Sequence, residues 1–169
     1  KSIGFVPLAD FGTLKEMPDI KKLTDKFPNL DEVASYIENK VVLVTGGGGS
    51  IGSELCRQIV RMKPKKVVIV DIYENNAYEI QQELAREGYG GDLVSVEIGS
   101  VRDMAKMRVI FEEYKFDVIF HAAAHKHVPL METNPEEAIK NNVKGTYNIA
   151  HLAHRYNVQK MVLISTDKA

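Results

Sequence analysis

The chain has 169 residues, of which 44% are hydrophobic and 27% charged, and these values fit one globular domain with a hydrophobic core. Its formal net charge of −1 excludes the basic surface of a nucleic-acid-binding domain, and its apolar runs are too short to span a membrane. The single cysteine, Cys56, excludes an internal disulfide and indicates a reducing compartment, so we expect a cytoplasmic protein and a small core residue.

Residues 1–28 show no sustained hydrophobic period, and we interpret them as a linker or an arm. The remaining residues, 29–169, have the pattern of one domain. Asn29 can cap a helix that runs to about Asn39, with Glu32 completing a capping box.

From Lys40 onward, apolar runs alternate with helical segments. We expect strands at 41–45, 66–71, 93–98, 117–121 and 160–165, each apolar on both faces as in a buried parallel sheet. Helices are expected from Ser50 to before Pro64, at 75–87, at 103–114 and at 135–156, the last capped by Asn134. This alternation predicts an α/β fold with a doubly wound parallel sheet. The predicted strand order is 3-2-1-4-5, with a ligand crevice between strands 1 and 4.

The first strand leads into a glycine-rich turn, TGGGGSIG, and Asp71 ends the second strand. A glycine turn that opens a helix presents backbone N–H groups and a positive dipole end to a diphosphate. Asp71 can accept hydrogen bonds from a ribose 2′-OH and would repel a 2′-phosphate, so the motif favours NAD over NADP. The alternative is a turn used only for tight packing. The expected cofactor residues here are Thr45, Gly46, Gly49, Ser50, Ile51, Gly52 and Asp71.

Three segments carry a resemblance to a known family. Thr45-Gly46-x-x-Gly49-x-x-Gly52 has the spacing of the short-chain dehydrogenase/reductases. Together with HAAAHKHVPLME at 121–132 and STDKA at 165–169, it resembles the extended members that act on nucleotide sugars, and most closely the capsular-polysaccharide-type UDP-N-acetylglucosamine 4,6-dehydratases. The resemblance covers about residues 40–169. It implies an NAD-binding Rossmann fold, a UDP-sugar substrate and a homo-oligomer.

The resemblance also implies contacts with the rest of the cofactor. The alanines after the fourth strand are small enough for the cofactor to lie against the backbone, and Asn142 would order the active-site end. Gly145 would let the last helix approach the sheet. The residues from Ser100 to Arg102 would lie near the adenine ring of the cofactor; the alternative is that Arg102 and Asp103 form a solvated pair that caps the third helix. The further cofactor residues are Ser100, Val101, Ala122, Ala123, Ala124, Asn142 and Ser165.

Further polar residues lie at the end of the fourth strand and after it. Lys126 and His127 are expected in a loop that leads away from the cofactor face, where they would contact the diphosphate of the substrate or a neighbouring subunit; the alternative is an exposed polar loop. His121 is expected to be structural, and His151 and His154 to face solvent or an interface. No cluster has metal-ligand spacing, so we expect no metal.

The resemblance assigns the chemistry to Thr166, Asp167 and Lys168. In the family reaction, NAD⁺ takes a hydride from C4 of the sugar, C5 loses a proton, water leaves from C6, and the hydride returns to C6 while C5 takes up a proton again. Thr166 would polarise the C4 oxygen, Asp167 would protonate the leaving hydroxyl and Lys168 would deprotonate C5. The alternatives are an exposed Asp167–Lys168 ion pair, an epimerase or reductase of the same family, and a non-catalytic NAD-binding module.

The chain ends at Ala169, before the Tyr-x-x-x-Lys segment and the small sugar-binding domain that this family carries. We therefore expect a cofactor-binding fragment that is inactive alone. In the parent family a membrane region often precedes this domain, and residues 1–28 are a candidate tether.

Overall fold

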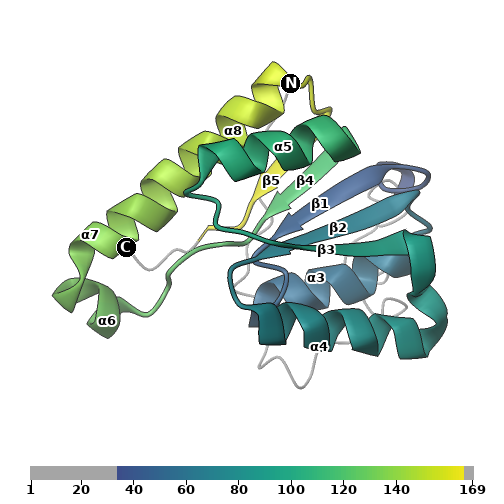
Figure 1. Ribbon diagram of the computed structural model, residues 1–169, viewed down its shortest axis with the longest axis horizontal. Coiled ribbons are helices and arrows are strands. Elements are labelled where there is room, and N and C mark those ends of the chain that lie inside the picture. The colour runs from purple at the N-terminus through teal and green to yellow at the C-terminus, as the bar shows by residue number, and fades with distance from the viewer. Residues whose placement is uncertain (1–33, 166–169) are drawn as a thin grey trace, which may run out of the picture.

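The computed structural model describes residues 34–165 and has a single parallel sheet (Figure 1). Five strands lie in the order β3-β2-β1-β4-β5, and every pair of neighbours is parallel. The predicted fold class and strand order are confirmed, with strand ends that differ from prediction by at most two residues. The strands are β1 (Val41–Thr45), β2 (Lys66–Asp71), β3 (Val94–Ile98), β4 (Val118–His121) and β5 (Lys160–Leu163).

Helices cover both faces of this sheet (Figure 1). Helices α3 (Ser50–Arg61) and α4 (Glu74–Leu84) lie on one face, and α5 (Met104–Tyr114) and α8 (Thr146–Arg155) lie on the other. Val42 and Val44 pack into the core on the α3 side, while Leu43 between them packs into the core on the α5 side. This alternation is why the strands are apolar at every position. Cys56 is fully buried in the first core, as expected.

Two helix ends can now be compared with the prediction, the end of α4 and the start of α5. After α4 the chain continues through one π turn, η3 (Ala85–Tyr89), which ends the helical run because Gly88 has a φ of +92°. A short 3₁₀ turn, η4 (Gly91–Leu93), then leads into β3. Asp103 caps α5 by accepting hydrogen bonds from the N–H groups of Ala105 and Lys106.

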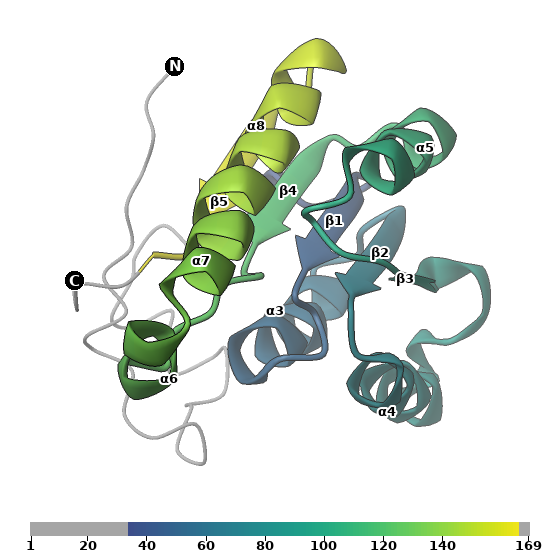
Figure 2. The ribbon, with the colours of Figure 1, turned by 60° about the vertical axis from the view of Figure 1, so that its left-hand side comes forward.

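The last predicted helix is one rod made of three pieces, as Figure 2 shows. These are α7 (Pro135–Ala138), a π segment η5 (Ile139–Gly145) and α8, and the residues at both junctions keep right-handed helical dihedrals. The prediction that the Asn134 side chain caps this helix is wrong, because its amide donates instead to the carbonyl of Leu130 and to the hydroxyl of Thr133. A short helix that was not predicted, α6 (Val128–Thr133), precedes it.

The helix expected before β1 is described only at its end. Residues 34–35 are helical and 36–39 form a turn, so the helix stops before the predicted Asn39, which has a φ of +59°. Ile37 in this turn is buried in the first core. The interpretation of 1–28, the Asn29 cap, and Thr166, Asp167 and Lys168 all fall outside the described residues. Within residues 34–165, none of the helices combines the length and the apolar character needed to cross a membrane.

Candidate functional site

The glycine turn brings β1, α3 and the segment after β4 into contact. Gly46 has a φ of +68°, and a Cβ atom there would lie 2.8 Å from the carbonyl oxygen of Ala122 and from the backbone nitrogen of Ala123. A Cβ atom on Gly52 would lie 2.0 Å from the carbonyl oxygen of Gly46. Only glycine fits at these two positions, since the neighbouring atoms belong to the backbone and cannot move aside.

Packing also explains two further glycines of the turn. A Cβ atom would lie 2.6 Å from the Ile69 side chain at Gly47 and 2.8 Å from Asn76 at Gly48. Gly49 differs, because its φ of −73° suits any residue and the nearest atom to a Cβ would be the Gly46 oxygen at 3.2 Å. Tight packing therefore accounts for most of this motif but not for Gly49, which lines a pocket.

That pocket lies at the N-terminus of α3 and has a volume of about 80 Å³. Gly49 occupies the N-cap position without a capping side chain, and the N–H groups of the first helical turn have no acceptor within the helix. The positive end of the helix dipole also faces this pocket, which makes it suitable for an anion. The lining residues are Gly46, Gly49, Ser50, Ile51, Gly52, Ala122, Ala124 and Lys126.

Lys126 adds a cation to this pocket. Its Nζ atom lies 3.3 Å from the hydroxyl oxygen of Ser50, the first residue of α3. The expectation that the Lys126 loop leads away from the cofactor face is therefore wrong: the loop runs past the glycine turn. His127 is exposed and stands at the N-cap position of α6.

Asp71 faces the glycine turn from the end of β2. Its carboxylate accepts hydrogen bonds from the N–H groups of Gly48 at 2.8 Å and Tyr73 at 2.9 Å. The residue is 8% exposed. A carboxylate offers about four acceptor positions, so about two remain for other donors. A further negative charge beside this group would be repelled.

The segment after β4 is held by two asparagines of η5. Asn142 accepts a hydrogen bond from the N–H of His125 at 2.8 Å and donates one to its carbonyl at 2.9 Å. Asn141 donates to the carbonyl of Ala123 at 2.9 Å. Asn142 was expected near the site, and Asn141 was missed. The signal was available, because two consecutive asparagines are unfavourable inside a helix unless their amides bind elsewhere.

The loop after β3 packs on the long helix rather than standing free. Val101 is 4% exposed, and a Cβ atom on Gly145 would lie 2.6 Å from its side chain. Gly145 therefore permits close approach to this loop, and not to the sheet as expected. Asn148 donates to the carbonyl oxygens of Val101 and Arg102.

The two polar residues of this loop also have partners. The hydroxyl of Ser100 accepts a hydrogen bond from the N–H of Arg102 at 3.2 Å. Arg102 forms a short ion pair with Glu137 of α7, so it does not pair with Asp103 as the alternative interpretation required.

The carboxyl ends of β4 and β5 meet beside the pocket. His121 is buried at the end of β4, as a structural residue would be, and burial lowers the pKa of its imidazole to about 4. The N–H of Ile164 donates to the carbonyl of His121 at 3.0 Å, so Ser165 follows at the same edge of the sheet. His151 and His154 are exposed, as expected. Over residues 34–165, no group of three His, Cys, Asp or Glu side chains could hold a metal ion.

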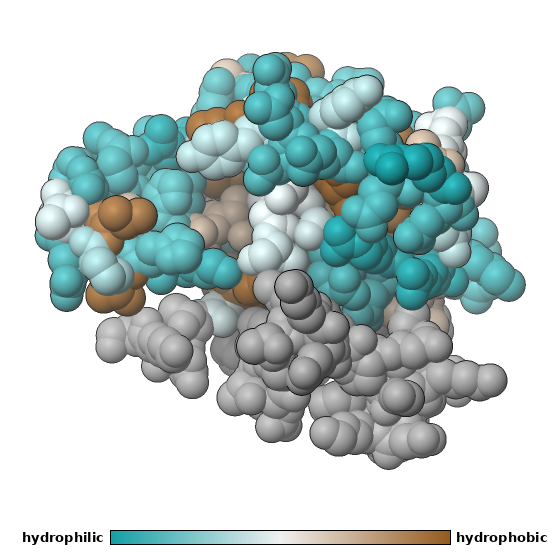
Figure 3. Space-filling model, turned by 90° about the horizontal axis from the view of Figure 1, so that it is seen from below, coloured by the Kyte–Doolittle hydropathy of each residue, from teal (hydrophilic) through white to brown (hydrophobic). Residues whose placement is uncertain are grey.

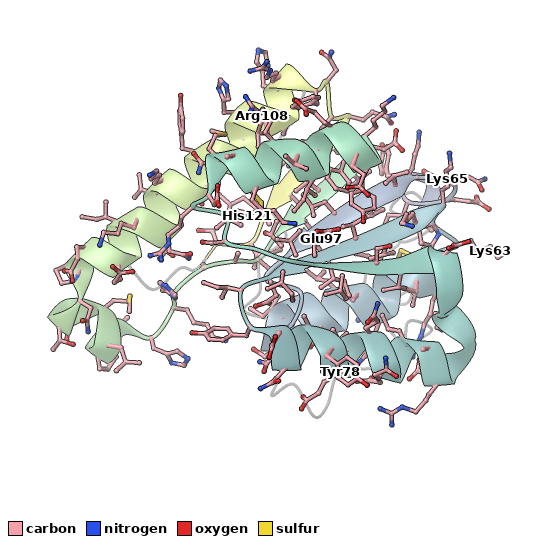
Figure 4. The ribbon with its side chains drawn as sticks, viewed as in Figure 1. Lys63, Lys65, Tyr78, Glu97, Arg108 and His121 are labelled. Carbon is pink, nitrogen blue, oxygen red and sulfur yellow. The ribbon has the colours of Figure 1, made fainter. Side chains whose placement is uncertain are left out.

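A larger groove of about 480 Å³ lies between α4 and the edge strand β3. Tyr78 stands at this groove and is 61% exposed (Figure 4). The lining residues include Glu74 and Asn75 at the N-terminus of α4, but the Glu74 carboxylate would repel an anion and none of the lining residues is cationic. The pocket at α3 is therefore the better candidate for an anionic ligand.

The comparison with known proteins agrees with this geometry. A family model described as "Polysaccharide biosynthesis protein" matches residues 42–169. The chain belongs to this family. The resemblance that the sequence motifs indicated is thereby confirmed.

Individual relatives are considerably longer than the chain. It is 49% identical over 139 residues to the "Probable polysaccharide biosynthesis protein EpsC" of Bacillus subtilis, covering 82% of the chain and 23% of the relative. It is 34% identical over 131 residues to a "UDP-N-acetylglucosamine 4,6-dehydratase (inverting)" of Campylobacter jejuni, covering 77% of the chain and 37% of the relative. The chain thus spans between about a quarter and two-fifths of these proteins.

A solved Rossmann-fold structure with the same fold contains a bound dinucleotide. The UDP-glucose-4-epimerase of Stenotrophomonas maltophila, with bound NAD and formylated UDP-arabinopyranose, superposes with a TM-score of 0.67 at 28% identity. The match covers 76% of this chain and 37% of the epimerase.

Proposed function

We propose that the chain is the NAD-binding part of a nucleotide-sugar 4,6-dehydratase that acts on a UDP-N-acetylglucosamine-type substrate in polysaccharide biosynthesis. One observation carries the proposal: the pocket at the N-terminus of α3 combines free N–H groups with Lys126, and Asp71 stands on the neighbouring strand. The pocket suits an anion such as a diphosphate, and Asp71 suits a ring that carries hydroxyl groups, such as a ribose.

The residues present fit NAD. The diphosphate would accept hydrogen bonds from the first-turn N–H groups of α3, and the ammonium of Lys126 would balance one of its charges. The free acceptor positions of Asp71 would bind the adenosine ribose, and its negative charge disfavours NADP. Ala122 and Ala124 line the pocket and leave room for the cofactor to approach the end of β4.

When bound, NAD⁺ supplies a hydride acceptor for C4 of the sugar. The residues proposed for the proton transfers follow β5 in the chain: Thr166 to polarise the C4 oxygen, Asp167 to protonate the leaving hydroxyl and Lys168 to deprotonate C5. The end of β5 supports this proposal, since it lies beside β4 at the edge of the sheet that carries the pocket. We also retain His127 as a candidate for contact with the diphosphate of the substrate.

The second candidate is a nucleotide-sugar 4-epimerase. The fold matches an epimerase that carries NAD, which supports this alternative. The Asp167-Lys168 pair favours the dehydratase, because removal of water needs an acid and a base that simple epimerisation at C4 does not.

The proposed location is the cytoplasm, where Cys56 would stay reduced.

The proposed partner is a second copy of the chain. One face of the long helix carries three exposed apolar side chains at a spacing of four residues: Ile139, Val143 and Tyr147, which are 61%, 63% and 64% exposed. Glu136 stands at the start of this helix and Arg155 at its end, so antiparallel pairing of two copies would bring opposite charges together.

The test separates binding from turnover. Calorimetry on the chain should show NAD binding that exceeds NADP binding. Turnover is measured on a protein of the relatives' length that contains this chain, with UDP-N-acetylglucosamine and NAD. A product lighter than the substrate by one water, with no net reduction of NAD⁺, supports the dehydratase. A product of unchanged mass would favour the epimerase, and absence of NAD binding would overturn the whole proposal.

A further inference from the structure

His121 is a buried polar side chain whose two ring nitrogens both have partners. It is 2% exposed and ends β4, between the sheet and α8 (Figure 4). Its Nδ1 atom lies 2.6 Å from the hydroxyl oxygen of Thr45, and its Nε2 atom lies 3.0 Å from that of Thr146. The imidazole therefore bridges β1 and α8 through β4.

These two threonines belong to segments that build the pocket. Thr45 directly precedes Gly46, and His121 directly precedes Ala122, whose carbonyl oxygen packs against Gly46. Thr146 begins α8, directly after η5, whose two asparagines hold the backbone of the segment after β4. One side chain thus joins the glycine turn, the alanine segment and the long helix.

The two hydrogen bonds of the ring have opposite directions, whichever tautomer it adopts. Burial keeps the pKa of His121 near 4, so the ring is neutral at pH 7. A neutral imidazole has one donor and one acceptor nitrogen, so one threonine donates to it and the other accepts from it. Replacing the hydroxyl of either threonine by a methyl group leaves a buried ring nitrogen of His121 without a partner. This nitrogen can find a new partner only if the glycine turn, the alanine segment or the long helix moves.

We propose that His121 is a positioning residue for the NAD pocket, which fixes the spacing of the glycine turn, the alanine segment and α8 through its bonds to Thr45 and Thr146. The imidazole itself contacts neither cofactor nor sugar. This inference rests on the proposed function, because NAD binding is the property that it controls. A purely structural histidine would stabilise the fold and leave the affinity of the folded protein for NAD unchanged.

The experiment compares two substitutions at Thr146, which lies outside the pocket. Thr146→Val keeps the shape and removes the hydroxyl, while Thr146→Ser keeps the hydroxyl. Val118→Ala, in the same strand as His121 but at its opposite end, is the control for lost stability. The dissociation constant for NAD is measured by calorimetry at a temperature at which every variant is fully folded.

The expected result is an increase of about tenfold in the dissociation constant for Thr146→Val, the equivalent of one lost hydrogen bond. Thr146→Ser and Val118→Ala should stay within about twofold of the unsubstituted chain. Equal affinity of Thr146→Val and Val118→Ala would overturn the positioning role while leaving the proposed function intact. If the unsubstituted chain does not bind NAD, the proposed function fails and this inference fails with it.

A second measurement covers the case in which Thr146→Val does not fold. The imidazole ¹⁵N spectrum of the unsubstituted chain should show His121 as a single neutral tautomer whose ¹⁵N shifts move when NAD is added. Two tautomers in exchange, or shifts that NAD leaves unchanged, would contradict the proposal.

Discussion

Gly49→Ala separates ligand binding from packing in the glycine turn. Gly49 has a φ of −73° and a ψ of 167°, which alanine adopts without strain, and its added methyl group would meet only the Gly46 oxygen at 3.2 Å. Gly→Ala at a compatible position changes stability by about 0.4–1 kcal/mol in the favourable direction, and the close oxygen offsets part of that gain. The fold should therefore keep its stability within about 1 kcal/mol.

Binding should respond very differently. The methyl group would project beside a pocket of about 80 Å³ and keep a diphosphate from the first-turn N–H groups of α3. A hydrogen bond to a charged group contributes about 1.5–3 kcal/mol, so losing one should weaken NAD binding roughly tenfold to 100-fold. Calorimetry gives the affinity and urea unfolding gives the stability.

Gly52→Ala is the matched control for this substitution. Its methyl group would lie 2.0 Å from the Gly46 oxygen, so it should destabilise the fold itself. Wild-type NAD affinity in Gly49→Ala would show that the turn serves packing alone and does not bind the diphosphate.

Four other outcomes follow. Lys126→Met should raise the dissociation constant for NAD about tenfold and reduce its salt dependence, whereas Lys144→Met on the long helix should change neither. Calorimetry at two ionic strengths measures both quantities. Equal effects of the two substitutions would contradict the role of Lys126 as the cation that binds the diphosphate. Asp71→Asn should lower the free energy of unfolding by about 1–3 kcal/mol, because the single amide oxygen can accept from only one of the two N–H groups that the carboxylate binds. The same substitution should reduce the ratio of NAD affinity to NADP affinity, and an unchanged ratio would contradict the ribose contact. The folded-state pKa of His121 lies below its unfolded value of 6.5, so the free energy of unfolding should fall by about 2 kcal/mol between pH 7 and pH 5 as the unfolded state gains a proton. Urea unfolding at several pH values should show this dependence in the unsubstituted chain and not in His121→Asn. The same pH dependence in His121→Asn would exclude this histidine as the cause. Val143→Lys should dissociate the proposed homo-oligomer in sedimentation experiments, and an unchanged sedimentation coefficient would reject this helix face as the contact.

The strands and the glycine turn could be predicted because their signals are local. A strand buried on both faces is apolar at every position, as Val42, Leu43 and Val44 illustrate. The strand order then follows from right-handed crossovers between parallel strands. Asp71 was recognised because its distance from the glycine turn along the chain is fixed by one strand–helix–strand unit.

The contacts that complete the pocket depend on long-range geometry. Lys126 and Ser50 are 76 residues apart in sequence, and the loop that joins β4 to α6 has no period to reveal its path. Helix α6 itself was missed, although Pro129 near its start is a recognisable signal. The exposed apolar residues Val128 and Leu130 of this helix were equally unforeseen, and Figure 3 shows hydrophobic residues at the end of the molecule where α6 lies.

An amide titration shows where NAD binds on the chain. The ¹⁵N-labelled chain is titrated with NAD⁺ and, separately, with NADP⁺, and the backbone shifts are followed. We expect NAD⁺ to move the signals of residues 46–52 and Lys126 most, and NADP⁺ to move them much less. Shifts concentrated in the groove between α4 and β3, around Tyr78 and Ile98, with the glycine turn unmoved, would contradict this expectation.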